Sequence, residues 1–318
     1  MESAGRKLSI IGAGAVGTSI AYAALIRGVA RTVALVDVNA DKVAAEVLDL
    51  SHGLEFVPRA KVIGSPDPAV CADSDVVIFT AGAKQKPGQT RLELAEATID
   101  LTRRALPPIV EAAPNARYVM VTNPVDVITY AALKFTGLPR SQLFGSGTVL
   151  DSSRLRFLLS EHCRVAVQNV HAYIAGEHGD SEIPLWSSAT IGGVPLLDWE
   201  PTTGGELLDA AARDAIRAEV VGSAYRIIQG KGATNYAIGL ASARIAEAVL
   251  DDEHRVLPVS SLIEDDFHGI SDVCLSLPTV VDADGAGARL PIALSTDELS
   301  GLRSSAQTLK DMQNKFGL

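Results

Sequence analysis

The sequence predicts an α/β protein in which a doubly wound parallel sheet is followed by a mixed α+β domain. In the first half, short apolar runs rich in β-branched residues alternate with longer stretches compatible with helices, as in parallel strands joined by crossover helices. The run at 76–79, Val-Val-Ile-Phe, is apolar throughout, which predicts that helices cover both faces of the sheet. After about residue 145, long helical patterns are interleaved with strand pairs. We therefore expect two domains, at residues 1–145 and 146–318.

The expected elements can be placed in chain order. Five apolar runs predict the strands of the first domain: Leu8–Ile11, Thr32–Asp37, Lys61–Ile63, Asp75–Ala81 and Arg117–Thr122. A helical stretch from Thr18 to Arg27 follows the first strand. In the second domain, residues at i, i+3, i+4 and i+7 predict one face of a helix that begins near Asp151. They are Leu155, Leu158, Leu159 and His162.

Turn and cap signals organise the C-terminal part of the chain. Asp284-Gly285 lies between two apolar runs, and an Asp-Gly pair tolerates the positive φ angles that hairpin turns require. Ser295 and Glu298 have the spacing of a capping box, in which two backbone N–H groups at a helix start are bonded by side chains. The last element should be an amphipathic helix, with one stripe formed by Leu299, Leu302, Ala306, Leu309 and Met312.

Composition excludes several classes of protein. The chain has 28 Lys and Arg against 38 Asp and Glu, a net charge of −10 that repels nucleic acid and anionic lipid. Its three cysteines are widely separated, so we expect reduced thiols and no metal ion. The start lacks the pattern of a cleaved leader, and no apolar run is long enough to cross a bilayer. We expect a cytoplasmic protein with neither nucleic acid nor a membrane as a partner.

A glycine motif follows the first strand directly. In Gly12-Ala13-Gly14-Ala15-Val16-Gly17, the first glycine permits a tight turn, the second lets the backbone approach a pyrophosphate, and the third allows close helix packing. Asp37 comes 20 residues after Gly17, where a carboxylate can bind the ribose hydroxyls of the adenosine half of a dinucleotide. The motif indicates a Rossmann domain, and Asp37 favours NAD over NADP by repelling a 2′-phosphate. Alternatively, Asp37 is only a helix cap or a surface acid.

A histidine between glycines predicts acid–base chemistry. His178 lies in Gly176-Glu177-His178-Gly179-Asp180-Ser181-Glu182, a polar loop after the strand-like run Val170–Ala175. An imidazole titrates near neutral pH, so it can give a proton to a carbonyl oxygen and remove one from an alcohol. Asp151 is the candidate to orient it, and Arg154 lies three residues further along the same helix face.

The order and spacing of four motifs identify a family resemblance. GAGAVG at 12–17, TNPVD at 122–126, GSGTVLDSSR at 145–154 and GEHGDSE at 176–182 make the chain similar, nearly from end to end, to the lactate/malate dehydrogenase family of bacterial type. The resemblance implies that His178 exchanges the proton and that Asp151 holds its imidazole in the useful tautomer. It also implies that Arg154 binds the substrate carboxylate and that Arg91, in a lid segment, polarises the ketone.

Further roles are carried over from the family. The resemblance implies that Asn123 bonds the substrate or cofactor and that Thr234 lines the substrate pocket. The implied NAD contacts are Gly12, Ala15, Val16, Gly17, Asp37, Lys42, Gly82, Ala83, Thr122 and Asn123. Each substrate residue also has a structural interpretation. Arg91 could be a solvated loop charge, Arg154 could simply pair with Asp151, Asn123 could build a turn and Thr234 could cap a helix.

Gln85 bears on the choice between two substrates. Malate enzymes of the family usually have an arginine at this position, which pairs with the second carboxylate of oxaloacetate, whereas neutral Gln85 could not compensate a buried anion. The resemblance therefore favours pyruvate and L-lactate. Malate activity, longer 2-oxo acids as in L-2-hydroxyisocaproate dehydrogenases, and a dinucleotide sensor without chemistry remain as alternatives.

A second pair of basic residues suggests regulation. Arg156 is two positions from Arg154 and so points to a different helix face. In bacterial members of the family, an arginine there and a histidine at the position of His171 bind fructose 1,6-bisphosphate at a subunit interface. The resemblance thus implies a possible effector site and a homotetramer. An interface salt bridge or a buried strand histidine explains the two residues about as well.

Overall fold

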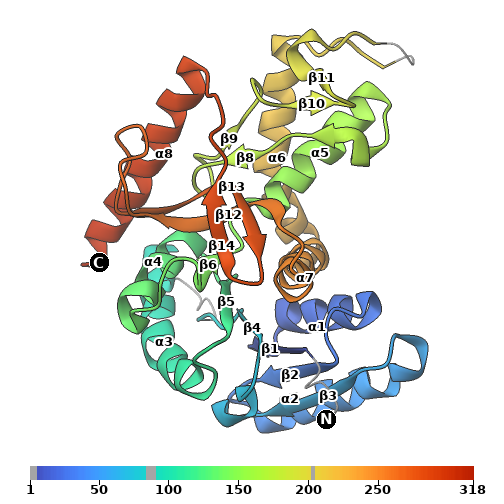
Figure 1. The fold of residues 1–318 in the computed structure, drawn as a ribbon, viewed down its shortest axis with the longest axis vertical. Coiled ribbons are helices and arrows are strands. Elements are labelled where there is room, and N and C mark those ends of the chain that lie inside the picture. Colours follow the sequence, from blue (N-terminus) through green and yellow to red (C-terminus); the bar gives the residue numbers. More distant parts are fainter. Residues whose placement is uncertain (1–5, 84–90, 202–204) are drawn as a thin grey trace.

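A computed structural model describes residues 6–83, 91–201 and 205–318 of the chain, and in these residues the central element is a nine-stranded sheet (Figure 1). Six of these strands are parallel and lie in the order β3-β2-β1-β4-β5-β6. Their bounds are β1 (Lys7–Ile11), β2 (Thr32–Val36), β3 (Lys61–Ser65), β4 (Val76–Phe79), β5 (Arg117–Met120) and β6 (Leu143–Gly145). This order is that of a doubly wound dinucleotide-binding sheet, which confirms the predicted fold class.

Helices cover both faces of the parallel strands, as the continuous apolar runs predict. Ile10 and Ile78 point to one face and pack with apolar residues of α1 and α7. Ile11 and Phe79, one position along, point to the other face and pack with α3 and α4. The bounds of the helices around the parallel strands are α1 (Ala15–Arg27), α2 (Ala40–His52), α3 (Arg91–Ala112), α4 (Val125–Thr136) and α7 (Tyr236–Leu250).

The sheet continues from the first half of the chain into the second. Strands β12 (Arg255–Ile263), β13 (Val273–Asp282) and β14 (Gly285–Arg289) are antiparallel and extend it beyond β6. Ser260 of β12 is paired with Gly145 of β6. Asp282 is paired with Gly285 across the predicted hairpin turn, where Gly285 has a φ of +99°. A single sheet therefore links the two predicted domains.

The strand at Ile183–Pro184 and the helix at Thr296–Lys315 contribute apolar residues to the core that contains α3 and α4, and the remaining elements of the second half form a lobe with its own core. Apolar residues of α5 and α6 pack there with β7, β8 and β10. The bounds are α5 (Val149–Cys163), β7 (Val170–His171), β8 (Ile174–Ala175), β9 (Ile183–Pro184), β10 (Thr190–Ile191), β11 (Val194–Pro195), α6 (Ala210–Lys231) and α8 (Thr296–Lys315). Short 3-10 helices are η1 (Leu54–Phe56), η2 (Pro68–Cys71), η3 (Val167–Asn169) and η4 (Leu196–Asp198).

Several element boundaries differ from the sequence predictions, including the ends of β3, β4 and β5. Helix α1 begins at Ala15 rather than Thr18, and α5 begins at Val149 rather than Asp151. The predicted strand at 170–175 is two strands, because β7 pairs with β10 while β8 pairs with β9, in a different sheet. At the last helix the predicted capping box is present, with Ser295 and Glu298 each bonded to the other's backbone N–H.

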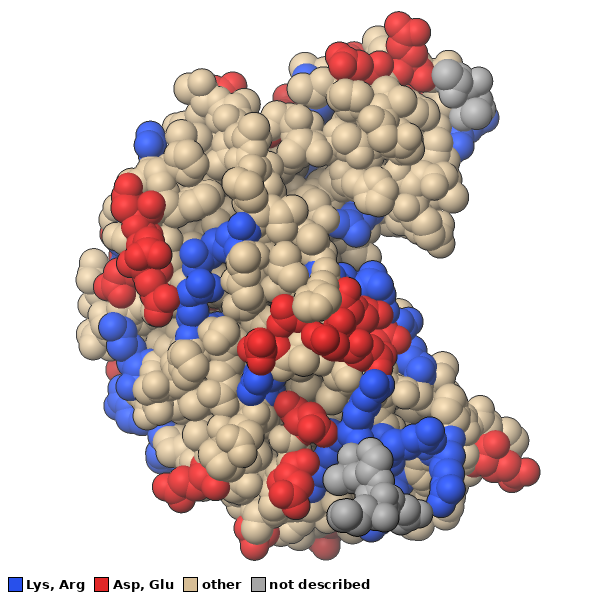
Figure 2. Space-filling model, viewed as in Figure 1, with Lys and Arg blue, Asp and Glu red and all other residues tan. Residues whose placement is uncertain are grey.

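The surface carries charges of both signs. On the face drawn in Figure 2, acidic and basic side chains are interspersed in small groups. The three cysteines, Cys71, Cys163 and Cys274, are buried and free. Among the described residues, no helix combines the length and the apolar character needed to span a membrane.

Candidate active site

The carboxyl ends of the parallel strands carry the residues selected from the sequence. Gly12 directly follows β1, Asp37 follows β2, and Thr122 and Asn123 follow β5. Parallel strands end at the same edge of a sheet, and open α/β sheets bind ligands in the crevice at that edge. The residues expected to bind a dinucleotide are therefore brought to one edge.

The glycine loop has the shape of a pyrophosphate cradle. Gly12 has a φ of +100°, and a Cβ added there would lie 2.9 Å from Thr80 Oγ1. A Cβ at Gly17 would lie 1.9 Å from the Gly12 carbonyl oxygen, so α1 can approach the loop only because residue 17 has no side chain. A Cβ at Gly14 would meet no atom within 4 Å, so this part of the loop faces open space. Together with the free N–H groups at the start of α1, this arrangement fits a dinucleotide phosphate.

Asp37 connects the second strand to the glycine loop. Its Oδ2 accepts a hydrogen bond from the Ala13 N–H at 2.9 Å, and its Oδ1 accepts one from the Asn39 N–H at 3.1 Å. The side chain that caps α2 is Asn39, which accepts from the Lys42 N–H at 3.0 Å, so Asp37 is not the helix cap. Each carboxylate oxygen of Asp37 keeps further acceptor capacity for a ribose hydroxyl.

The other expected cofactor residues lie beside these loops. Ala15 and Val16 form the first turn of α1, and Lys42 lies in the first turn of α2. Gly82 and Ala83 follow β4, and α3 holds the end of this segment because Thr98 accepts a hydrogen bond from the Ala83 N–H at 3.3 Å.

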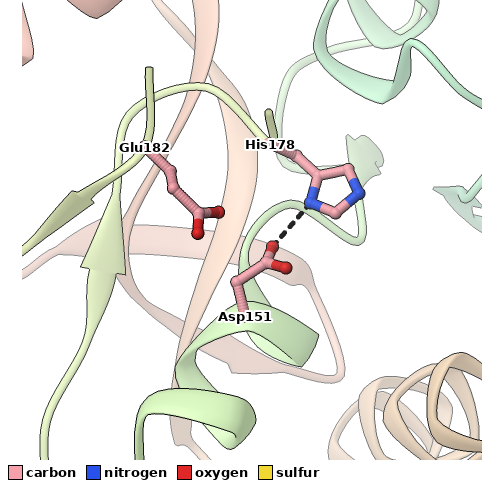
Figure 3. A group of neighbouring side chains, drawn as sticks. All are labelled: Asp151, His178 and Glu182. Atoms are coloured by element: carbon pink, nitrogen blue, oxygen red, sulfur yellow. Dashed lines mark hydrogen bonds and ion pairs between the residues drawn. The ribbon is translucent and has the colours of Figure 1, made fainter. Parts of the chain in front are cut away.

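Asp151 joins two of the selected side chains. Its Oδ2 lies 2.5 Å from Nδ1 of His178, and its Oδ1 lies 2.5 Å from Nη1 of Arg154 (Figure 3 draws the first contact). Asp151 is buried in the first turn of α5, and His178 lies in the loop after β8. Arg154 lies one helical turn from Asp151, as its i+3 spacing predicts. The structure thus brings together the acid, the imidazole and the guanidinium selected from the sequence.

Electrostatics stabilise a charged pair at this position. Burial alone would lower the pKa of His178, but the Asp151 carboxylate, with Asp126 and Glu182 further away, outweighs burial and raises it to about 9. Burial would raise the pKa of Asp151, but His178 and Arg154 outweigh it and keep that pKa below its ordinary value. The imidazole therefore holds a proton at neutral pH beside an ionised carboxylate.

A second acid, Asp126, fixes the backbone of the histidine loop. Its Oδ2 accepts a hydrogen bond from the His178 N–H at 2.7 Å, from the first turn of α4. Burial raises the pKa of Asp126 to about 6. Asp126 was not predicted as a site residue, although it lies within the TNPVD motif at 122–126.

A third acid, Glu182, also lies beside the pair. Its carboxyl group points toward His178 and Asp151 in Figure 3, and its side chain is buried. Glu182 lies within the GEHGDSE motif at 176–182, and no role was predicted for it. The apolar residues that follow it at 183–186 were the signal that this end of the loop enters the core.

The remaining substrate residues are less closely defined. Thr234 is half-buried in the loop between α6 and α7, and the N-cap position of α7 is held by Asn235, without a side-chain capping bond, rather than by Thr234. Asn123 is exposed, and its side chain accepts a hydrogen bond from the Val125 N–H at 3.3 Å, as in a turn. Gln85 and the side chain of Arg91 lie outside the described residues.

The two residues of the expected effector site are neighbours. Arg156 Nε donates a hydrogen bond to the Ala172 carbonyl at 2.8 Å, and its guanidinium lies over the Tyr173 ring. His171, the residue before Ala172, is exposed on β7, so it is not a buried strand histidine.

Among the described residues, the same region contains a group of three side chains whose spacing would allow them to hold a metal ion. The ligand atoms that Asp151, His178 and Glu182 offer lie within 4.8 Å of one another. The facing atoms of Asp151 and His178 are already bonded to each other, which suits proton transfer rather than metal binding.

Comparisons with known proteins agree along nearly the whole chain. Residues 6–145 match the lactate/malate dehydrogenase NAD binding domain, and residues 148–316 match the lactate/malate dehydrogenase alpha/beta C-terminal domain. The chain is 56% identical to an L-lactate dehydrogenase of Bifidobacterium animalis subsp. lactis over 311 residues, which cover 98% of this chain and 97% of that protein. It is 46% identical to an L-lactate dehydrogenase of Kosmotoga olearia, over 96% of this chain and 94% of that protein.

A solved structure has the same fold. A lactate dehydrogenase from a Medee basin deep-sea metagenome library superimposes with a TM-score of 0.94 at 36% identity, covering 98% of this chain and 99% of the other. The matched N-terminal domain binds NAD, which agrees with the glycine loop and with Asp37. The chain therefore belongs to the lactate/malate dehydrogenase family of NAD-dependent oxidoreductases.

Proposed function

We propose that the chain catalyses reversible hydride transfer between NADH and pyruvate, giving L-lactate. The observation that carries the proposal is the contact of His178 Nδ1 with Asp151 Oδ2, beside Arg154. An oriented imidazole next to a guanidinium suits a substrate with a carbonyl and a carboxylate on adjacent carbons. Relatives named L-lactate dehydrogenase, at up to 56% identity among those compared, support lactate as the product.

His178 exchanges the proton in this proposal. Because Nδ1 faces Asp151, Nε2 is the ring atom that can reach a substrate oxygen. When pyruvate is reduced, the imidazolium gives its Nε2 proton to the carbonyl oxygen, and Asp151 remains ionised. Bound NADH supplies the hydride to the carbonyl carbon, and NAD⁺ accepts it in reverse. Lactate oxidation returns the proton to His178.

Arg154 and neighbouring groups hold the substrate. One guanidinium nitrogen of Arg154 is bonded to Asp151, and its other N–H groups can form a two-pronged pair with the substrate carboxylate. We propose that Asn123 and Thr234 bond or line the same pocket. Arg91 would stabilise the negative charge that develops on the ketone oxygen, and Gln85 would exclude a second carboxylate.

The two parts of the chain have different tasks in this proposal. Residues 1–145 bind NAD and residues 146–318 supply the histidine and the substrate arginine. The separate family matches at 6–145 and 148–316 support a boundary at this point. We propose that NAD contacts Lys42, Gly82, Ala83 and Thr122 in addition to the glycine loop.

Arg156 and His171 form the proposed effector site for fructose 1,6-bisphosphate. Two observations support this site. Arg156 is bonded to the carbonyl of Ala172, the residue after His171, and His171 is exposed. In a homotetramer, two-fold axes would bring two such pairs around one doubly phosphorylated ligand.

A homotetramer in the cytoplasm is the assembly we propose. Exposed apolar side chains of α1 and α7 line one groove, and these include Tyr22, Ile26, Tyr236 and Leu240. An exposed apolar groove favours contact with other protein. An interface salt bridge remains the alternative role of Arg156.

One absorbance assay tests the proposed function. NADH oxidation is followed after addition of pyruvate, then oxaloacetate, then a longer 2-oxo acid such as 2-oxoisocaproate. We expect pyruvate to give the highest kcat/KM. Preference for oxaloacetate or the longer acid would contradict the substrate assignment. Binding of NADH with no turnover of any 2-oxo acid would favour a dinucleotide sensor.

A further inference from the structure

Glu182 is a buried acid next to the catalytic pair of His178 and Asp151. Only 3% of its surface is exposed. Its N–H donates to the Gly179 carbonyl at 3.2 Å, closing the turn that directly follows His178, and β9 begins at the next residue. The turn therefore holds the Glu182 side chain next to the imidazole.

The carboxyl groups of Asp151 and Glu182 differ in their hydrogen-bond partners. One oxygen of Asp151 contacts His178 and the other contacts Arg154, both at 2.5 Å. Glu182 Oε1 is buried and has no hydrogen-bond partner in the described structure. Facing atoms of Glu182, Asp151 and His178 nevertheless lie within 4.8 Å of one another.

Two buried carboxylates this close together cannot both ionise freely, because like charges repel and burial disfavours each charge. Asp151 has a cation on each oxygen and so keeps its charge. The other charged groups around Glu182 are His178 and Glu177 in its own loop and Arg154 on α5, and Asp126 on α4 faces His178. Of the two carboxyl groups, that of Glu182 should therefore be the protonated one.

We propose that Glu182 is a positioning residue, neutral when the imidazole works near neutral pH, whose ionisation controls how strongly His178 holds the catalytic proton. This inference rests on the proposed function for its kinetic consequence. The direction of the pKa shift agrees, since burial first, and then the Asp151 charge, raises the pKa of Glu182 to about 8.

The consequence for catalysis follows from the charges. When Glu182 ionises at alkaline pH, it adds a negative charge near His178, and the imidazolium becomes harder to deprotonate. Pyruvate reduction needs protonated His178, whereas lactate oxidation needs neutral His178. Glu182 therefore extends reduction to higher pH and delays the onset of oxidation.

The test compares wild type, Glu182→Gln and Asp180→Asn as full-length proteins. Asp180 is an exposed acid in the same loop and serves as the matched control. For each protein, kcat/KM is measured against pH for pyruvate with NADH and for L-lactate with NAD⁺. We expect Glu182→Gln to move the midpoints of both profiles to lower pH by at least about one unit, and Asp180→Asn to keep the wild-type midpoints.

A purely packing role would lower both profiles without moving their midpoints, and that result would overturn the proposal. Infrared spectra of wild type minus Glu182→Gln at neutral pH should also show the band of a protonated carboxyl group, and its absence would overturn the proposal too.

If Glu182→Gln does not fold, the same band is followed against pH in wild type with ¹³C-labelled glutamate carboxyls. Wild type that turns over neither substrate would refute the proposed function, while the infrared result still decides the protonation of Glu182.

Discussion

Nδ1 of His178 lies 2.5 Å from Oδ2 of Asp151, although 27 residues separate the two along the chain. The contact places a buried carboxylate behind the imidazole and leaves Nε2 for the substrate. The same carboxylate also binds Arg154, so one acid sets the position of both the proton donor and the proposed substrate clamp.

Replacing Asp151 by Asn should lower kcat for pyruvate reduction by about 10²–10⁴-fold, because the imidazolium loses its counter-charge and its fixed tautomer. The pKa of His178 should also fall from about 9, since burial then acts without the opposing carboxylate. Reduction is present below this pKa and lost as pH rises through it, so the decline should begin at lower pH in the variant. A pH series of kcat/KM measures this. Glu161→Gln, an exposed position on α5, is the control, and equal pH profiles for the Asp151 variant and wild type would contradict the role of Asp151.

Gln85→Arg should move kcat/KM from pyruvate toward oxaloacetate by orders of magnitude. A guanidinium at this position can pair with the second carboxylate, whereas Gln85 leaves that charge uncompensated. Parallel initial-rate measurements with the two keto acids give the ratio. An unchanged preference would refute the assignment of Gln85.

Fructose 1,6-bisphosphate should lower the apparent KM for pyruvate, and Arg156→Gln should abolish this effect. The guanidinium of Arg156 is expected to bind a phosphate group through charge-assisted hydrogen bonds. Pyruvate saturation curves with and without the sugar bisphosphate measure it, with Arg217→Gln as an exposed-arginine control on α6. Curves of the wild type that do not respond to the sugar bisphosphate would count against the site.

The pH dependence of the protein's stability should also reveal the ionisation of Glu182. Its pKa is about 8 in the folded chain against an ordinary value of 4.5, so the folded state keeps a proton that the unfolded state loses between these pH values. In this window, wild-type stability should fall relative to Glu182→Gln by at most about 1.4 kcal/mol per pH unit. Below 4.5 the difference should be constant. Thermal unfolding at a series of pH values tests this, and a Tm difference independent of pH would show that Glu182 ionises normally.

Local patterns were sufficient for most of the fold. Five of the six parallel strands were predicted from short apolar runs, and the glycine motif marks the start of α1. The sixth, β6, has only three residues and was not predicted. The pairing of β12 with β6 is a contact between residues such as Ser260 and Gly145, which are distant in sequence. No local pattern encodes such a pairing, and the continuous sheet was not predicted.

The site was predicted where residue type determines chemistry. His178, Asp151 and Arg154 are reactive groups whose spacing and motifs identify them, and the structure brings them together. Asp126 and Glu182 were missed because their importance comes from burial next to His178, which depends on how α4 and the histidine loop pack. An acid in a polar motif looks solvated until its tertiary neighbours are known.

Proton transfer by His178 is tested by the turnover of His178→Asn with NADH and pyruvate, measured together with the affinity for NADH by fluorescence. We expect kcat to fall by at least about 10²-fold while the Kd for NADH changes little, because only the proton donor is lost. Turnover close to that of wild type would contradict the claim that His178 moves the proton.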